Sequence, residues 1–210
     1  YDKGNKYNRF TIYEIMKKYI KRRFRLIMYK LNQSRFDTVI PKNFIYFGLH
    51  TQPESSIDVQ GGNHTNQIEF VRNLRKNTPS NIEVVVKVHP TDVDGKPFSY
   101  FQKFINIPGV KLFSYSANST DLIQKSLYTV TITGTAGIEA ICMCKPVVTF
   151  VKNYYNMYEG VTYCNSWKQY SKYSRSNPVN YNYEKNRIIF KNFLDFTFEG
   201  EVSRAYGSDP

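Results

Sequence analysis

The chain has 210 residues, enough for one sizeable hydrophobic core, and its 29 basic and 17 acidic residues give a net charge of +12. This charge favours an anionic partner, which can be nucleic acid, acidic lipid or a nucleotide-linked substrate. Three cysteines, an odd number, argue against a disulfide framework, and no apolar run approaches the roughly 20 residues that span a bilayer, so we expect a cytoplasmic protein.

Residues 1–40 form a basic amphipathic segment, expected to end a domain that lies largely upstream, since the chain begins at Tyr1 rather than at a Met. Within residues 10–31, apolar side chains recur at helical spacing and basic side chains fill much of the other side, which predicts a helix. The apolar positions are Ile12, Ile15, Met16, Tyr19, Ile20, Phe24, Ile27, Met28 and Leu31. Such a helix can pack on its own domain, lie on anionic lipid or bind nucleic acid.

Residues 41–152 alternate between short apolar runs and amphipathic stretches. The predicted strands are 44–49, 82–88, 110–113, 127–132 and 146–151, and the predicted helices are 65–76, 98–107, 120–126 and 136–143. This alternation is typical of βαβ units and predicts an α/β, Rossmann-like domain with a parallel sheet, whose ligands bind at the carboxyl ends of the strands. Cys142 and Cys144 lie in an apolar stretch and are expected to be buried thiols.

Residues 153–210 form a C-terminal segment that is rich in Tyr and Asn and has weak periodicity up to about residue 182. We expect loops and short helices there, and a helix over residues 183–198, where apolar positions again recur at helical spacing. The last dozen residues are expected to fray.

A polar cluster follows the first predicted strand. It contains His50, Gln52 and Glu54 in the sequence Leu-His-Thr-Gln-Pro-Glu, and Pro53 stiffens the loop. Glu54 can act as a base, a nucleophile or a group that binds hydroxyls, and His50 and Gln52 are candidates for donor binding. The alternative is a surface loop in which Glu54 caps a helix or pairs with a lysine.

Lys87 and His89 end the second predicted strand, in the sequence Lys-Val-His-Pro. An imidazole at this position can donate a hydrogen bond to a phosphate oxygen or act as a general acid toward a leaving phosphate. The alternative is a structural histidine at a strand end.

A strand–turn–helix sequence, Thr-Gly-Thr-Ala-Gly-Ile-Glu-Ala, begins at residue 133. Small residues allow a ligand to approach the backbone, and the start of a helix offers free N–H groups to a phosphate. The candidate nucleotide-binding residues are Thr133, Gly134, Thr135, Ala136, Gly137 and Glu139. Glu139 can reach ribose hydroxyls, although an acid near a helix start is also stabilising in itself.

The order of these motifs (LHxQPE, VKxHP, TGTAGxEA and KPVV) resembles that of bacterial capsule polysaccharide biosynthesis glycosyltransferases, over roughly residues 41–155. This family includes the β-Kdo transferases that use CMP-Kdo. The resemblance implies that the chain is the C-terminal, donor-binding half of a two-domain GT-B glycosyltransferase. It also implies that Glu54 and His89 are the catalytic pair, and that the loop from Gly134 to Gly137, with Glu139, holds the nucleotide.

The implied reaction transfers a sugar from a CMP-activated donor to a glycan or lipid-linked acceptor of capsule or surface polysaccharide, with no metal or other cofactor. Residues 10–31 would then contact the anionic inner face of the cytoplasmic membrane, and nucleic acid is not expected as a partner. Three alternatives remain: a CDP-alditol phosphotransferase of the teichoic-acid type, a UDP-sugar GT-B transferase or epimerase, and a non-catalytic basic module that binds lipid or nucleic acid.

Overall fold

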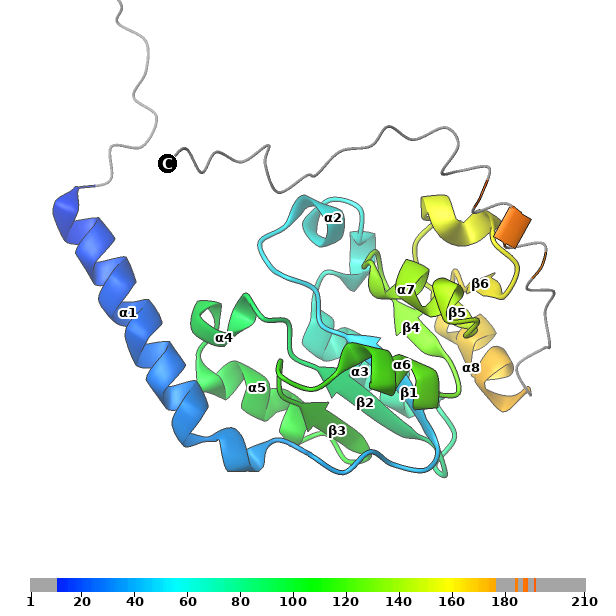
Figure 1. The fold of residues 1–210 in the computed structure, drawn as a ribbon, viewed down its shortest axis with the longest axis horizontal. Helices are drawn as coiled ribbons and strands as arrows, with labels where there is room; N and C mark the ends of the chain where they lie inside the picture. Colours follow the sequence, from blue (N-terminus) through cyan, green and yellow to red (C-terminus); the bar gives the residue numbers. More distant parts are fainter. Residues whose placement is uncertain (1–10, 177–183, 185–186, 189–190, 192–210) are drawn as a thin grey trace, which may run out of the picture.

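The computed structural model describes residues 11–176, 184, 187, 188 and 191, and one parallel sheet lies at its centre (Figure 1). The strands are β1 (Phe44–Gly48), β2 (Glu83–Lys87), β3 (Val110–Phe113), β4 (Thr129–Thr131), β5 (Val147–Thr149) and β6 (Val161–Tyr163). Their order in the sheet is β3-β2-β1-β4-β5-β6, and every neighbouring pair is parallel. This order confirms the predicted α/β, Rossmann-like class.

Helices connect the strands as the alternating pattern predicts. They are α1 (Ile12–Leu31), α2 (Ser55–Asp58), α3 (Gln67–Asn77), α4 (Asp92–Gly95), α5 (Phe98–Ile105), α6 (Ser119–Lys125), α7 (Ala136–Cys142) and α8 (Trp167–Arg175). Several begin at a side-chain cap: Asn66 accepts from the backbone of α3 and Asn118 from that of α6, which satisfies N–H groups that a helix start leaves unpaired.

Both faces of the sheet are covered, so consecutive residues in the middle of β1 and β2 are apolar and buried rather than alternating with polar ones. Ile45 and Phe47 of β1 face α3, α5 and α8, whereas Phe44 and Tyr46 face α6 and α7. These packed layers fix the carboxyl ends of the strands, where the polar motifs begin.

The prediction of loops and short helices for residues 153–182 was incomplete, because this segment contains the strand β6 and the nine-residue helix α8. The strand β6 has three residues at the edge of the sheet, of which two are half-buried and one is exposed, so it carries no apolar run that reveals it. The parallel sheet therefore extends beyond residue 152. The helix expected over residues 183–198 and the frayed tail lie outside the described residues, apart from residues 184, 187, 188 and 191.

The prediction of buried thiols at Cys142 and Cys144 was wrong, because both side chains are exposed. The helix α7 ends at Cys142, and the chain then turns at Cys144, which has a positive φ of 59°. Cys164 is buried, and none of the three forms a disulfide.

The predicted helix in residues 10–31 is confirmed as α1, which begins at a capping box formed by Thr11 and Glu14. Its C-terminal half contacts α4 and α5, while its N-terminal end extends away from the domain (Figure 1). Within the described part of the chain, none of the helices combines the length and the apolarity needed to cross a bilayer.

Candidate functional site

The three polar motifs follow β1, β2 and β4, which are adjacent in the sheet. From β1, the strands β2 and β3 follow on one side in chain order, whereas β4 lies on the other side of β1. Ligands of open α/β sheets bind at this kind of reversal, in the crevice beyond the carboxyl ends of the strands. A cavity of about 450 Å³ lies there.

Most of the candidate residues line this cavity. Those present are His50, Glu54, Lys87, His89, Thr133, Gly134, Thr135, Ala136 and Glu139. Gln52 and Gly137 do not line it. The structure therefore brings together residues that are up to 89 positions apart in the chain (139 − 50 = 89), as expected for loops at one sheet edge.

His50 is 6% exposed and supports the loop that follows β4. Its Nε2 accepts a hydrogen bond from the backbone N–H of Thr133 at 3.2 Å, and its own backbone pairs with the side chain of Gln67 at 2.7 and 2.8 Å. Burial, with a smaller effect of His89, lowers the pKa of His50 to about 4, so the ring is neutral at pH 7. His50 thus positions the loop after β4 while it also lines the cavity.

The loop after β4 passes close to His50 at Gly134, where a side chain would have little space. A Cβ on Gly134 would lie 3.0 Å from Nε2 of His50 and 3.2 Å from Oγ1 of Thr131. The backbone N–H of Gly134 also donates to Oγ1 of Thr131 at 2.9 Å. Oγ1 of Thr133 is buried and has no hydrogen-bond partner among the described residues, so it is available to a ligand in the cavity.

Two threonines fix the ring of His89. Nδ1 lies 2.7 Å from Oγ1 of Thr51 and 2.8 Å from Oγ1 of Thr91, and the backbone N–H of Thr91 donates to it at 3.3 Å. Because Nδ1 accepts, the neutral ring carries its proton on Nε2. Burial lowers the pKa of His89, although Glu54 opposes this effect. The neutral ring is thus suited to donating a hydrogen bond from Nε2 to an anionic oxygen.

Charged groups of both signs surround the cavity. Burial lowers the pKa of Lys87, and nearby Glu139 opposes this effect. The carboxylate of Glu139 accepts a hydrogen bond from the hydroxyl of Thr135 at 3.2 Å. Glu54 lies on the opposite loop, where its backbone N–H donates to Asp58 at 2.9 Å and its carbonyl accepts from the first turn of α2. The cavity therefore combines cationic and neutral donors with two exposed carboxylates.

Gln52 and Gly137 have partners within the protein. The amide of Gln52 donates to Asp58 at 2.7 Å and to the carbonyl of Thr65 at 2.9 Å, which ties the two ends of the loop together. The peptide bond between Gln52 and Pro53 is cis. Gly137 packs against Tyr155, since a Cβ there would lie 2.8 Å from the ring.

Sequence reasoning missed several lining residues, namely Tyr46, Thr51, Ser119 and Thr131. Tyr46 and Thr131 belong to strands, and the sequence contains no signal that distinguishes them from core residues. Thr51 lies within the first motif, and its polar neighbours were the available signal. Ser119 begins α6 after β3, so its position after a strand end was the signal there.

Among the described residues, no group of three or more His, Cys, Asp and Glu side chains is arranged to hold a metal ion. That the protein needs no metal stays a prediction.

A family model described as capsule polysaccharide biosynthesis protein matches residues 2–193. No curated protein matches the sequence significantly.

Solved structures give more distant likenesses. The chain is 18% identical to Thermosulfurimonas dismutans KpsC, beta Kdo 2,4 transferase, with 70% of this chain and 50% of that chain covered and a TM-score of 0.46. It is 14% identical to the beta Kdo 2,7 transferase of the same KpsC, covering 90% and 63%, with a TM-score of 0.46. For the UDP-GlcNAc 2-epimerase from Methanocaldococcus jannaschii the identity is 14%, the coverage 87% and 52%, and the TM-score 0.48. The chain thus spans between half and two thirds of these structures.

Proposed function

The chain belongs to the family of capsule polysaccharide biosynthesis proteins, and from this premise we propose that it is the donor-binding half of a GT-B glycosyltransferase. The proposed reaction transfers a sugar, with Kdo as the first candidate, from a CMP-activated donor to a glycan or lipid-linked acceptor. Because the described cysteines form no disulfide, a reducing compartment such as the cytoplasm suits the protein.

The observation that carries the proposal is the cavity at the reversal of strand order, where side chains from the ends of three adjacent strands converge and two of these strands, β2 and β4, supply hydrogen-bond donors. Lys87 ends β2 and His89 follows it, and the hydroxyl of Thr133 lies just after β4. Hydrogen-bond donors that are held in place before the reaction stabilise the charge that develops on a departing phosphate. This arrangement supports a substrate that carries its sugar on a phosphate.

We assign Glu54 and His89 as the catalytic pair. His89 would donate its Nε2–H to the phosphate oxygen that leaves the sugar, because Thr51 and Thr91 hold Nδ1 as the acceptor. Glu54, on the facing loop, would act on the sugar or on the acceptor hydroxyl. Glu139 would bind ribose hydroxyls, with Thr135 orienting its carboxylate.

Calorimetric titration of the full chain with CMP, CDP and UDP tests the donor. We expect CMP to bind, and we expect His89→Ala to weaken this binding about tenfold, which is the value of one hydrogen bond to a charged group. His64→Ala is the matched control, because His64 lies outside the cavity. Binding of UDP without CMP would instead support a UDP-sugar enzyme, and the absence of all three would leave the proposal without support.

A further inference from the structure

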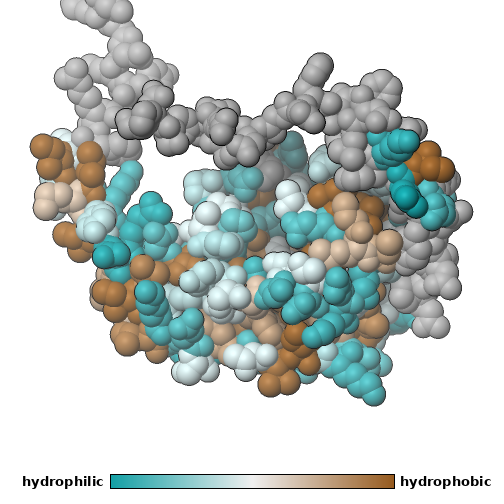
Figure 2. Space-filling view, viewed as in Figure 1, coloured by the Kyte–Doolittle hydropathy of each residue, from teal (hydrophilic) through white to brown (hydrophobic). Residues whose placement is uncertain are grey.

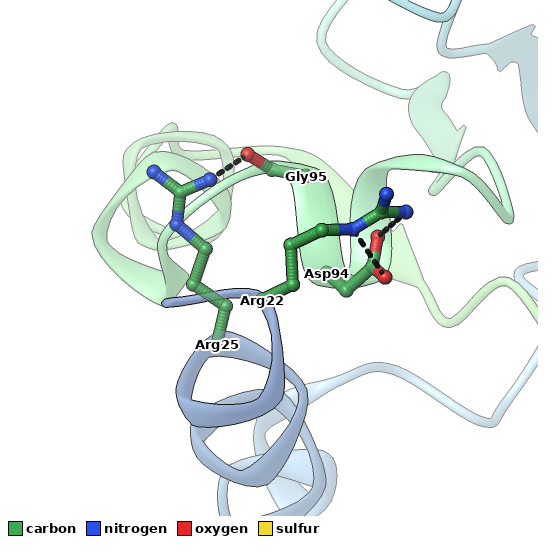
Figure 3. A network of polar contacts seen from close by, with 4 residues as sticks. All are labelled: Arg22, Arg25, Asp94 and Gly95. Carbon is green, nitrogen blue, oxygen red and sulfur yellow. Dashed lines mark hydrogen bonds and ion pairs between the residues drawn. The ribbon is translucent and has the colours of Figure 1, made fainter. Parts of the chain in front are cut away.

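The helix α1 contacts its own domain through a side that carries two arginines together with the apolar Leu26 and Tyr29. Arg22 forms a bidentate pair with Asp94 of α4 at 2.9 and 3.0 Å, and Arg25 donates to the carbonyl of Gly95 (Figure 3). One turn further on, Tyr29 is buried against α5. The two arginine contacts use charged side chains of a kind that an amphipathic helix usually turns to solvent.

The opposite side of α1 is apolar and exposed, and none of the other described residues buries it. We call it the apolar face, formed by Tyr13, Met16, Ile20, Phe24, Ile27 and Leu31, which are spaced by three or four residues. At about 3.6 residues per turn, this face lies nearly opposite Arg22, Arg25 and Tyr29. Its side chains are between 54% and 73% exposed. Figure 2 shows the hydrophobic surface that gathers along α1.

Basic residues border the apolar face on both sides. The helix contains seven basic residues and one acidic residue: Lys17, Lys18, Lys21, Arg22, Arg23, Arg25 and Lys30 against Glu14. Lys17 and Lys21 lie along one edge of the face, and Arg23 and Lys30 lie along the other. A helix with an apolar face bordered by cations is suited to the interface of an anionic membrane.

A groove between α1 and α5 continues the apolar face. It has a volume of about 530 Å³ and includes Phe24 of the face itself. Its apolar lining comes from Phe24, Met28 and Phe98, and its cations are Lys21, Arg25 and Arg35. A groove with this lining matches the phosphate and the first acyl carbons of an anionic lipid.

We propose that α1 lies on an anionic lipid surface, with the apolar face buried among the acyl chains and the bordering cations at the headgroups. Nucleic acid would match the charge but would leave the apolar face in water. A second copy of the chain would bring two strongly cationic helices together. Lipid is therefore the partner that satisfies both the charge and the apolar area. This inference uses no residue of the cavity, so it stands independently of the proposed sugar transfer.

Cosedimentation of the full chain with vesicles tests the proposal. We expect binding to phosphatidylcholine vesicles that contain phosphatidylglycerol, weak binding to phosphatidylcholine alone, and a decrease in affinity as salt rises. The double variant Ile20→Glu and Phe24→Glu should abolish most of the binding. Lys17→Gln and Arg23→Gln together should weaken it, by about fivefold for each charge removed near the surface.

The matched control is the double variant Val39→Glu and Val59→Glu. These side chains are 79% and 77% exposed and lie outside α1, so the same charge is added away from the helix. We expect this control to bind as the unchanged chain does, and circular dichroism should show equal helix content in all variants. Equal losses in both double variants would overturn the proposal, as would the absence of vesicle binding. Self-association that Phe24→Glu abolishes, without vesicle binding, would identify a second copy as the partner instead.

Discussion

The ring of His50, after β1, holds the backbone of Thr133, after β4, through a hydrogen bond of 3.2 Å from the N–H of Thr133 to Nε2. This contact joins the two strands between which the order of the sheet reverses. Because Nε2 accepts, the ring is neutral and its proton is on Nδ1, which is buried and has no partner among the described residues. The loop that lines the cavity therefore depends on an uncharged histidine.

Protonation of His50 should destabilise the protein in acid. The pKa of His50 is about 4 in the folded chain and 6.5 in an unperturbed histidine, so the unfolded chain takes up the proton first as the pH falls. The contribution of His50 to the free energy of unfolding is present above pH 6.5 and is lost as the pH falls toward 4. Between pH 7.5 and pH 5 we expect His50 to lower the free energy of unfolding by about 2 kcal/mol.

Urea denaturation of the unchanged chain and of His50→Gln at both pH values measures this contribution. Glutamine does not titrate, so the decrease between pH 7.5 and pH 5 should be smaller in the variant by about 2 kcal/mol. His64 and His89 are present in both chains, so most of their contribution cancels in the comparison. An identical decrease in both chains would show that His50 is not the group that titrates.

Gly134→Ala should disturb the cavity without unfolding the domain. The added Cβ would lie 3.0 Å from Nε2 of His50, which is held by its own backbone contacts, so the loop itself has to move. We expect the affinity for CMP in calorimetry to fall about tenfold, as for the loss of one good hydrogen bond.

Gly95→Ala is the control for this substitution. It has no atom within 4 Å of an added Cβ and no positive φ. We expect unchanged affinity and equal or slightly higher stability, because alanine restricts the unfolded chain. An equal loss of affinity in both variants would mean that the close approach of the loop to His50 has no part in binding.

Binding of CMP should raise the pKa of His89. In the free protein burial lowers this pKa, and a phosphate close to Nε2 would favour the charged ring. We expect an increase of about one pH unit in NMR titration. His64 serves as an internal reference, because burial lowers its pKa too but its ring lies among Phe70, Phe150 and Trp167. Equal shifts of both histidines, or none at His89, would contradict contact between His89 and the phosphate.

The sequence was sufficient to predict five of the six strands of the parallel sheet and the edge at which the motifs meet, because apolar runs and the polar residues that follow them are local signals. It was insufficient for the roles within the cavity. His50 and His89 both follow a strand and both line the cavity, yet His50 is buried and supports the loop after β4, whereas the ring of His89 is held between Thr51 and Thr91. What distinguishes the two histidines is the packing of Gln67 and Thr133 around His50. Gln67 lies 17 positions and Thr133 lies 83 positions from His50 in the chain.

The same limit applies to α1. Its spacing predicts one apolar and one basic side, and the usual expectation is that the apolar side packs on the domain. Which side packs depends on Asp94 and on the carbonyl of Gly95, which attract Arg22 and Arg25 and lie about 70 positions along the chain. No local pattern contains that information.

Gly137 illustrates how a motif glycine can serve packing. A Cβ at this position would lie 2.8 Å from the ring of Tyr155, which is buried and donates through its hydroxyl to the carbonyl of Gly134. We expect Gly137→Ala to lower the free energy of unfolding by about 1–3 kcal/mol, because the ring has no space to move away.

A double-mutant cycle with Tyr155→Leu tests this cause. Once the ring is replaced, Gly137→Ala should cost at least about 1 kcal/mol less in urea denaturation, since the smaller side chain leaves space for the methyl group. An unchanged cost would show that Tyr155 is not the constraint. If Gly137→Ala instead weakens CMP binding and leaves the free energy of unfolding unaltered, the glycine is required for contact with the ligand, as the motif alone predicts, and its packing against Tyr155 is incidental.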